Sequence, residues 1–135
     1  MPLLVDAGIL YALADRSDAW HARAVDYLKQ FRPVLLAPVT VIPEAAYLVR
    51  TRLGEPQERK LIEGFANGGV TAEPLRDADF ARTSALMGKY PDLGFTDCSV
   101  VAIAERLALD TIATTDRRHF TLVRPKHLTR FTLVP

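Results

Sequence analysis

The chain has 135 residues, of which 49% are hydrophobic and 24% charged, which is the size and balance of one globular domain over residues 1–135. The 17 Lys and Arg residues against 16 Asp and Glu give a formal charge of +1, which excludes a general polybasic grip on nucleic acid or on an anionic membrane. A single cysteine, Cys98, excludes a disulfide framework and a zinc site built on several thiolates. We therefore expect a soluble cytoplasmic protein without a signal peptide or a membrane span.

Short apolar runs alternate along the chain with longer segments of helical period, a pattern typical of β-α units and a mainly parallel sheet. The run at residues 3–6 is apolar at consecutive positions, so it predicts a strand that is buried on both faces and central in the sheet. The five predicted strands cover residues 3–6, 34–37, 70–72, 111–114 and 131–134.

Helical segments fill the intervals between these strands. Ser17 is the predicted N-cap of a helix that ends before Pro33. In the helix over residues 77–90, Phe80, Ser84 and Met87 or their neighbours are expected to face the core. The predicted helices cover residues 9–14, 17–31, 61–66, 77–90 and about 96–109. A further helix follows the turn at residues 38–40 and ends at residue 53.

Four acidic residues fall at corresponding places in this pattern. Asp6 and Asp116 each end or follow a buried strand, whereas Glu44 and Asp97 each fall in the first turn of a helix. In an open α/β sheet the loops beyond the carboxyl ends of the strands form the crevice where ligands bind. The pattern therefore predicts that all four carboxylates meet in one pocket.

Converging carboxylates repel one another unless protons or a cation compensate their charge. Oxygen-only ligands select hard cations such as Mg²⁺ or Mn²⁺, which activate water and neutralise charge that develops on a phosphodiester. The chemistry that fits is metal-assisted hydrolysis of a nucleic-acid backbone. Each acid taken singly has a structural explanation as a helix cap, a first-turn acid or a turn residue, but such roles give no reason for four acids at the same end of one sheet.

The segments that carry these acids resemble the signature blocks of the PIN domain family, and most closely its VapC-type toxin ribonucleases. They are Leu3-Leu4-Val5-Asp6-Ala7-Gly8, Pro43-Glu44-Ala45, Gly94-Phe95-Thr96-Asp97-Cys98-Ser99 and Ala113-Thr114-Thr115-Asp116-Arg117-Arg118-His119-Phe120. The likeness covers nearly the whole chain in order and spacing. The Thr-Thr-Asp-Arg-Arg-His-Phe block is its most specific part.

The resemblance implies a three-layer α/β/α domain with a parallel five-stranded sheet, an acidic pocket for one or two Mg²⁺ or Mn²⁺ ions, and endonuclease activity on RNA. By position, Asp6, Glu44, Asp97 and Asp116 match the catalytic, metal-binding acids of the family. Thr114 or Thr115 matches its supporting hydroxyl, and Ser99 a further polar position near the metal. Members of the family form homodimers and are neutralised by a small antitoxin protein, so the resemblance implies both partners here.

Several other residues have two explanations each. Arg117 and Arg118 directly follow Asp116 and could contact RNA phosphates or only solvent. Trp20 belongs to a set of apolar helix residues that serve either the core or a protein interface. The three histidines, His21, His119 and His127, lack the spacing of a metal site and are predicted to be surface or packing residues.

Two alternative functions share the same fold. The first is an RNA-processing nuclease of the PIN family that is not a toxin. The second is a non-catalytic adaptor for RNA or protein, which the intact set of acids argues against. A phosphoacceptor signalling domain is excluded, because Asp6 is followed by Ala7 and Gly8 and no lysine follows a core strand.

Overall fold

The computed structural model describes residues 2–135 and contains one five-stranded, all-parallel sheet. Its strands lie in the order β3-β2-β1-β4-β5, so β1 is central, as its unbroken apolar sequence predicts. Leu3, Leu4 and Val5 of this strand are buried. The strands are β1 (Pro2–Val5), β2 (Val34–Pro38), β3 (Thr71–Glu73), β4 (Thr111–Ala113) and β5 (Thr132–Val134).

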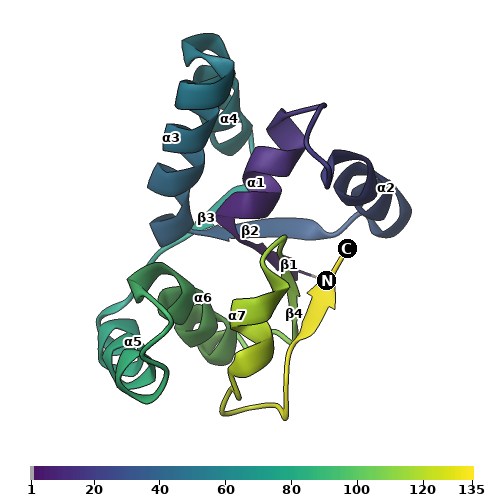
Figure 1. Cartoon of the computed structure of the whole chain (residues 1–135). Helices are drawn as coiled ribbons and strands as arrows, with labels where there is room; N and C mark the ends of the chain where they lie inside the picture. The colour runs from purple at the N-terminus through teal and green to yellow at the C-terminus, as the bar shows by residue number, and fades with distance from the viewer. Residues whose placement is uncertain (1) are drawn as a thin grey trace.

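Helices cover both faces of the sheet, and Figure 1 shows α1 to α4 on one side with α5 and α6 on the other. This is the predicted three-layer α/β/α arrangement. None of the helices in residues 2–135 is long and apolar enough to cross a membrane. They are α1 (Ala7–Ala14), α2 (His21–Phe31), α3 (Ile42–Leu53), α4 (Glu55–Ala66), α5 (Asp77–Lys89), α6 (Phe95–Arg106) and α7 (Arg117–Leu122), with a 3₁₀ turn at Val39–Val41 before α3.

The direction in which the chain adds strands reverses between β1 and β4. From β1 the chain proceeds outward to β2 and β3, and it then returns to place β4 on the other side of β1. The pairing of Leu4 with Ile112 and of Val5 with Ala113 brings the carboxyl ends of the two strands together. Loops diverge at such a point and leave a crevice, so the fold itself creates a site beyond Val5 and Ala113.

One local expectation is wrong. Ser17 is not a helix cap: it lies in a turn where its backbone N–H and hydroxyl donate to Asp15, and α2 begins only at His21. Such short-range hydrogen bonds to a nearby side chain compete with capping, and both use the same residue types. The stretch after Asp116 forms a short helix, α7.

Much of helix α6 is buried, because every residue from Cys98 to Ala104 is buried. Helix α5 packs on α6 through Asp79, Thr83 and Leu86. These residues are the sequence neighbours of Phe80, Ser84 and Met87, which were expected to face the core either themselves or through their neighbours. Phe80 and Met87 are exposed.

An ion-pair network fastens α5 to α6. Asp79 is buried, and both its carboxylate oxygens lie 3.1 Å from Nε of Arg106, whose Nη1 lies 3.0 Å from Glu73 of β3. Asp79 also accepts the backbone N–H of Arg76 at 2.9 Å, at the start of α5. This network joins α5, α6 and the edge strand, so it holds the helix that carries Asp97.

Replacing Arg106 by alanine should lower the free energy of unfolding by about 3 kcal/mol, because it leaves the buried Asp79 carboxylate without its counter-charge. Urea unfolding followed by circular dichroism measures this change. The control is Arg59→Ala, which removes an exposed arginine 3.8 Å from Glu63 and should cost less than about 1 kcal/mol. Equal effects of the two substitutions would contradict the role given to Arg106.

Candidate active site

The central strand delivers Asp6 to the crevice. Asp6 is the N-cap of α1, and its Oδ1 accepts the backbone N–H of Ile9 at 3.0 Å. Its backbone N–H donates to the carbonyl of Ala113, which extends the pairing of β1 with β4. Only 8% of the residue is exposed. Strand end and helix cap together therefore hold this carboxylate at one place in the crevice.

The end of β4 supplies the hydroxyl that supports Asp6. The buried Thr114 hydroxyl donates to Oδ2 of Asp6 and accepts the backbone N–H of Asp116 at 2.9 Å. One side chain thus ties the first acid of the site to the backbone of the last one. The expected supporting role falls to Thr114 in this structure, while Thr115 lines the pocket itself.

Gly8 is the residue that lets α1 approach Thr115. A Cβ atom added to Gly8 would lie 2.3 Å from Oγ1 of Thr115 and 3.4 Å from Oδ1 of Asp6. The first distance is far inside van der Waals contact, so any side chain here would displace Thr115. A glycine two residues after Asp6 is therefore a steric requirement of the site.

The two helix acids complete the pocket. Glu44 lies in the first turn of α3 directly after Pro43, and Asp97 lies in the first turn of α6. Carboxylates in a first turn are stabilised by the helix dipole, which offsets part of their mutual repulsion. Asp6, Glu44, Asp97 and Asp116 all line one pocket of about 190 Å³, so the structure brings the four predicted acids together.

His119 is the residue that the sequence analysis placed wrongly. It lies on α7, three residues after Asp116, and its Nδ1 is 2.9 Å from a carboxylate oxygen of Asp97 and 2.9 Å from one of Asp116. Neither contact meets the geometry of a hydrogen bond, so the two distances record close approach of the imidazole to both acids. The spacing Asp116 to His119 is one helical turn, but that signal appears only once α7 is known to be a helix.

Burial and mutual repulsion change the acidity of two of these groups. Burial raises the pKa of Asp6 to about 6, and the charges of Asp97 and Asp116 add to this shift, although its hydrogen bonds with Thr114 and Ile9 oppose it. Burial also raises the pKa of Asp97, while His119 counteracts the increase. The site is thus strained electrostatically, which is typical of functional carboxylates.

The donor set fits a hard divalent cation. Carboxylate oxygens are the ligands that Mg²⁺ and Mn²⁺ prefer, and a cation would relieve the repulsion that raises the pKa of Asp6. In residues 2–135 no group of three or more His, Cys, Asp and Glu side chains already has the arrangement of a metal site. The imidazole of His119 lies against two of the acids, so binding would require small side-chain movements around it.

The remaining candidate residues differ in their exposure: two are buried in α6 and two are exposed at the start of α7. Ser99 is buried and does not line the pocket, because its hydroxyl donates to the carbonyl of Thr96 at 2.6 Å and lies 2.7 Å from that of Thr40. Cys98 is fully buried, as expected of a small core residue. Arg117 and Arg118 are exposed beside the pocket, where solvent and RNA would both reach them.

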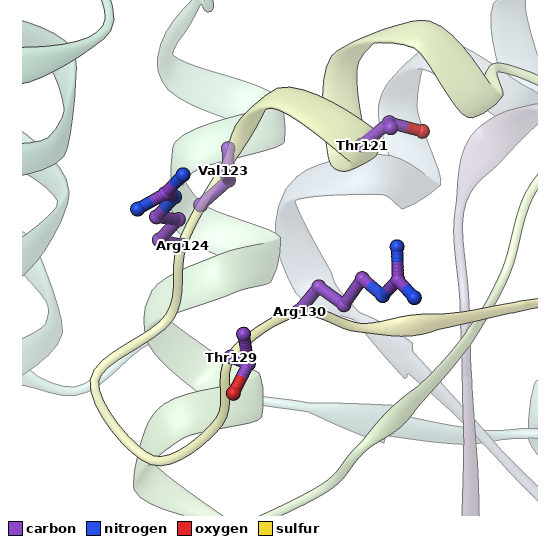
Figure 2. Close-up of a pocket in the computed structure, with 5 residues that line it drawn as sticks. All are labelled: Thr121, Val123, Arg124, Thr129 and Arg130. Atoms are coloured by element: carbon purple, nitrogen blue, oxygen red, sulfur yellow. The ribbon is translucent and has the colours of Figure 1, made fainter.

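A larger hollow at the C-terminal end of the molecule is a poor alternative site. It has a volume of about 510 Å³ and is lined by Thr121, Val123, Arg124, Thr129 and Arg130. Figure 2 shows that the guanidinium groups of Arg124 and Arg130 point in opposite directions. No acid lines it and its two charges do not converge on one point, so the acidic pocket remains the candidate active site.

Fold and pocket define an α/β protein with an acidic crevice at the reversal point of its parallel sheet. The chain belongs to the PIN domain family, whose model matches residues 3–124, and within it to the VapC-type proteins. A relative, Ribonuclease VapC26 of Mycobacterium tuberculosis, is 30% identical over 135 residues that cover 98% of this chain and all of that protein.

Solved structures show the same fold at lower identity. VapC20 of Mycobacterium tuberculosis, described as a sarcin-ricin loop cleaving toxin, superposes with a TM-score of 0.75 at 17% identity, covering 82% of this chain and 86% of that one. VapBC2 of Rickettsia felis, solved with a DNA fragment from its promoter, gives a TM-score of 0.72 at 13% identity and full coverage of both chains.

Replacing Asp6 by asparagine should stabilise the metal-free protein above pH 6. A pKa of about 6 against the ordinary 3.8 means that the folded state holds this proton more tightly than the unfolded state. Asp6 therefore lowers the free energy of unfolding as pH rises from about 4 to about 7, by about 3 kcal/mol in total. Urea unfolding of both proteins across this range, in the presence of a chelator, measures the difference.

Asp6→Asn should lose most of this pH dependence, and the exposed-loop control Asp92→Asn should keep it. A variant Asp6→Asn that is less stable than the wild type at pH 7.5 would show that burial does not oppose this charge.

Proposed function

We propose that this protein is a metal-dependent endoribonuclease, the toxin of a toxin–antitoxin pair, that hydrolyses RNA phosphodiester bonds in the acidic pocket. The observation that carries the proposal is the placement of Asp6, Glu44, Asp97 and Asp116 around one crevice at the reversal point of the sheet. Membership of the PIN domain family, the name of the relative Ribonuclease VapC26, and the description of a structural neighbour as a sarcin-ricin loop cleaving toxin support the same activity.

The proposed cofactor is Mg²⁺ or Mn²⁺. Asp6 and Asp97 are the central candidate ligands, since both are at least partly buried and both have a raised pKa, with Glu44 and Asp116 binding directly or through water. When bound, the cation supplies a water of lowered pKa as nucleophile and neutralises charge on the phosphodiester.

The side chains of the chain itself have separate tasks. Thr114 helps to fix the orientation of the Asp6 carboxylate through its hydroxyl. One of the exposed acids, Glu44 or Asp116, orients or deprotonates the attacking water. Arg117 and Arg118 lie beside this centre and contact the phosphates of the RNA strand.

The proposed protein partners are a small antitoxin and a second copy of this chain. Support for the antitoxin comes from two structural neighbours, VapBC2 of Rickettsia felis and a toxin–antitoxin complex from Klebsiella pneumoniae. Exposed aromatic residues, Tyr47 on α3 with Phe80 and Phe95 on α5 and α6, provide apolar surface of the kind that protein interfaces use.

Cleavage of RNA by the purified protein should require Mg²⁺ or Mn²⁺ and should fall about a hundredfold or more in Asp97→Asn, because that substitution removes a charge that holds the cation. Gel analysis of a labelled RNA pool, with metal and with chelator, measures the rate. Asp92→Asn, an acid on the exposed loop before α6, is the matched control and should cleave like the wild type. Unchanged cleavage by Asp97→Asn would remove the acidic pocket from the reaction.

Saturating Mn²⁺ should raise the melting temperature of the wild type by about 5 °C or more, because the cation binds only the folded state. The double variant Asp6→Asn/Asp97→Asn should show no such increase, while Asp92→Asn should respond as the wild type does. Differential scanning fluorimetry at several metal concentrations measures these shifts. Equal stabilisation of the double variant would place the metal elsewhere on the protein.

A further inference from the structure

We propose that Trp20, together with Arg23 and Arg117, forms a nucleotide-binding subsite that stacks a base of single-stranded RNA and holds its phosphate beside the acidic pocket. The inference rests on the proposed ribonuclease function and names the part of the surface that would grip the strand next to the scissile bond. It is carried by one aromatic ring on which two exposed cations converge.

The geometry around the ring is the first observation. The guanidinium carbon of Arg23 lies 4.0 Å from the centroid of the Trp20 ring, and that of Arg117 lies 5.5 Å from it. The two cations come from different parts of the chain, Arg23 from α2 and Arg117 from the start of α7. Trp20 is only half-buried, so this tryptophan is neither a core residue nor a fully solvated one.

The backbone of Trp20 is held in place. Its N–H donates to Oδ1 of Asp18 at 2.8 Å, and its carbonyl accepts the N–H of Ala24 at 2.9 Å at the start of α2. These bonds hold the backbone, while the guanidinium groups of Arg23 and Arg117 lie against the ring itself. A ring with such contacts presents a stacking surface at a smaller cost in conformational entropy than an isolated side chain.

The charges of the two arginines are the second observation. Within residues 2–135, neither Arg23 nor Arg117 lies within ion-pair distance of an Asp or Glu side chain, whereas Arg50 and Arg82 each have one such partner and Arg106 has two. Arg117 donates to an oxygen of Pro135, so part of its charge is already met, whereas the guanidinium of Arg23 makes no hydrogen bond or ion pair within residues 2–135. Two like charges at one ring repel each other, and an anion placed between them would turn this repulsion into attraction.

The position of Arg117 next to the acidic pocket indicates that this anion is a phosphate of the RNA strand. Arg117 is the residue after Asp116, so its side chain spans from the rim of the acidic pocket to Trp20. A strand whose scissile phosphate lies at the four carboxylates would have a neighbouring nucleotide within reach of the ring. The phosphate between the arginines would belong to the same strand that is cleaved.

The chemistry of the three side chains favours RNA over a protein partner. Unpaired bases stack on aromatic rings and on the planes of guanidinium groups, and arginines hold phosphates with paired N–H donors. A formal charge of +1 gives the molecule as a whole little electrostatic attraction for RNA. A local pair of arginines beside an aromatic ring would supply that attraction at one place on the surface.

Trp20 is the only tryptophan of the chain, so its fluorescence reports on the subsite directly. The probe is a short single-stranded oligoribonucleotide of random sequence, titrated into Asp97→Asn in the presence of a chelator so that no cleavage occurs. We expect the oligoribonucleotide to quench the fluorescence in a saturable way. When Arg23→Ala is combined with Asp97→Asn, the affinity for the oligoribonucleotide should fall about tenfold and should depend less on the salt concentration. Lys29→Ala, which removes an exposed charge further along α2, should leave the affinity within about twofold.

A second variant tests the ring itself. Trp20→Leu in the Asp97→Asn background should lose about tenfold in affinity, measured by polarisation of a labelled oligoribonucleotide, while circular dichroism verifies that it is folded. Arg23→Lys separates stacking from charge, because lysine keeps the charge but lacks the planar guanidinium, so its affinity should fall between those of the parent and Arg23→Ala.

The inference is overturned if the oligoribonucleotide binds without changing the fluorescence of Trp20, or if folded Trp20→Leu and Arg23→Ala bind as tightly as their parent. A fluorescence change produced by a protein partner but not by RNA would also overturn it. These outcomes can be told apart from a failure of the proposed function. If the proposed function is wrong, the wild-type protein shows no metal-dependent cleavage of RNA. If only the subsite is wrong, the wild-type protein cleaves RNA and Trp20→Leu has the same KM as the wild type.

Discussion

Repulsion among carboxylates at one end of the sheet is the constraint to which the rest of the site responds. Asp6 is buried at the end of the central strand and has a pKa of about 6, so the fold holds a group that is costly to ionise. Each contact of Asp6, with the N–H of Ile9 and with the hydroxyl of Thr114, lowers that cost. His119 does the same for Asp97. A divalent cation is the remaining compensation that this chemistry calls for.

The topology explains why the acids meet where they do. Parallel strands place their carboxyl ends at one edge, and the reversal between β1 and β4 opens a crevice at that edge. Asp6 and Asp116 reach it because each follows one of these two strands. Glu44 and Asp97 reach it because α3 and α6 begin there. The Arg106 network then holds α6, whose residues from Cys98 to Ala104 are all buried, against the edge of the sheet.

Much of this arrangement can be predicted from the sequence, since strand burial, parallel topology and the positions of the acids all follow from local pattern. The role of His119 could not, because it depends on α7 being a helix, which a sequence of six residues does not indicate. Ser99 shows the opposite failure: it follows Asp97 by two residues, but residues two apart on a helix do not face the same side. Trp20 reads as an apolar helix residue, and only the fold brings Arg117 to it.

The near-zero net charge of the chain is the sum of unlike parts. Four of its 16 acids lie in one pocket, and outside it lie cations such as Arg23 and Arg117, neither of which pairs with an Asp or Glu side chain within residues 2–135. These four acids are placed to hold a cation. Anomalous diffraction from crystals grown with Mn²⁺ is the sharpest test, and we expect a manganese peak in the pocket within coordination distance of oxygens of Asp6 and Asp97. A pocket that stays without such a peak while RNA is still cleaved would contradict it.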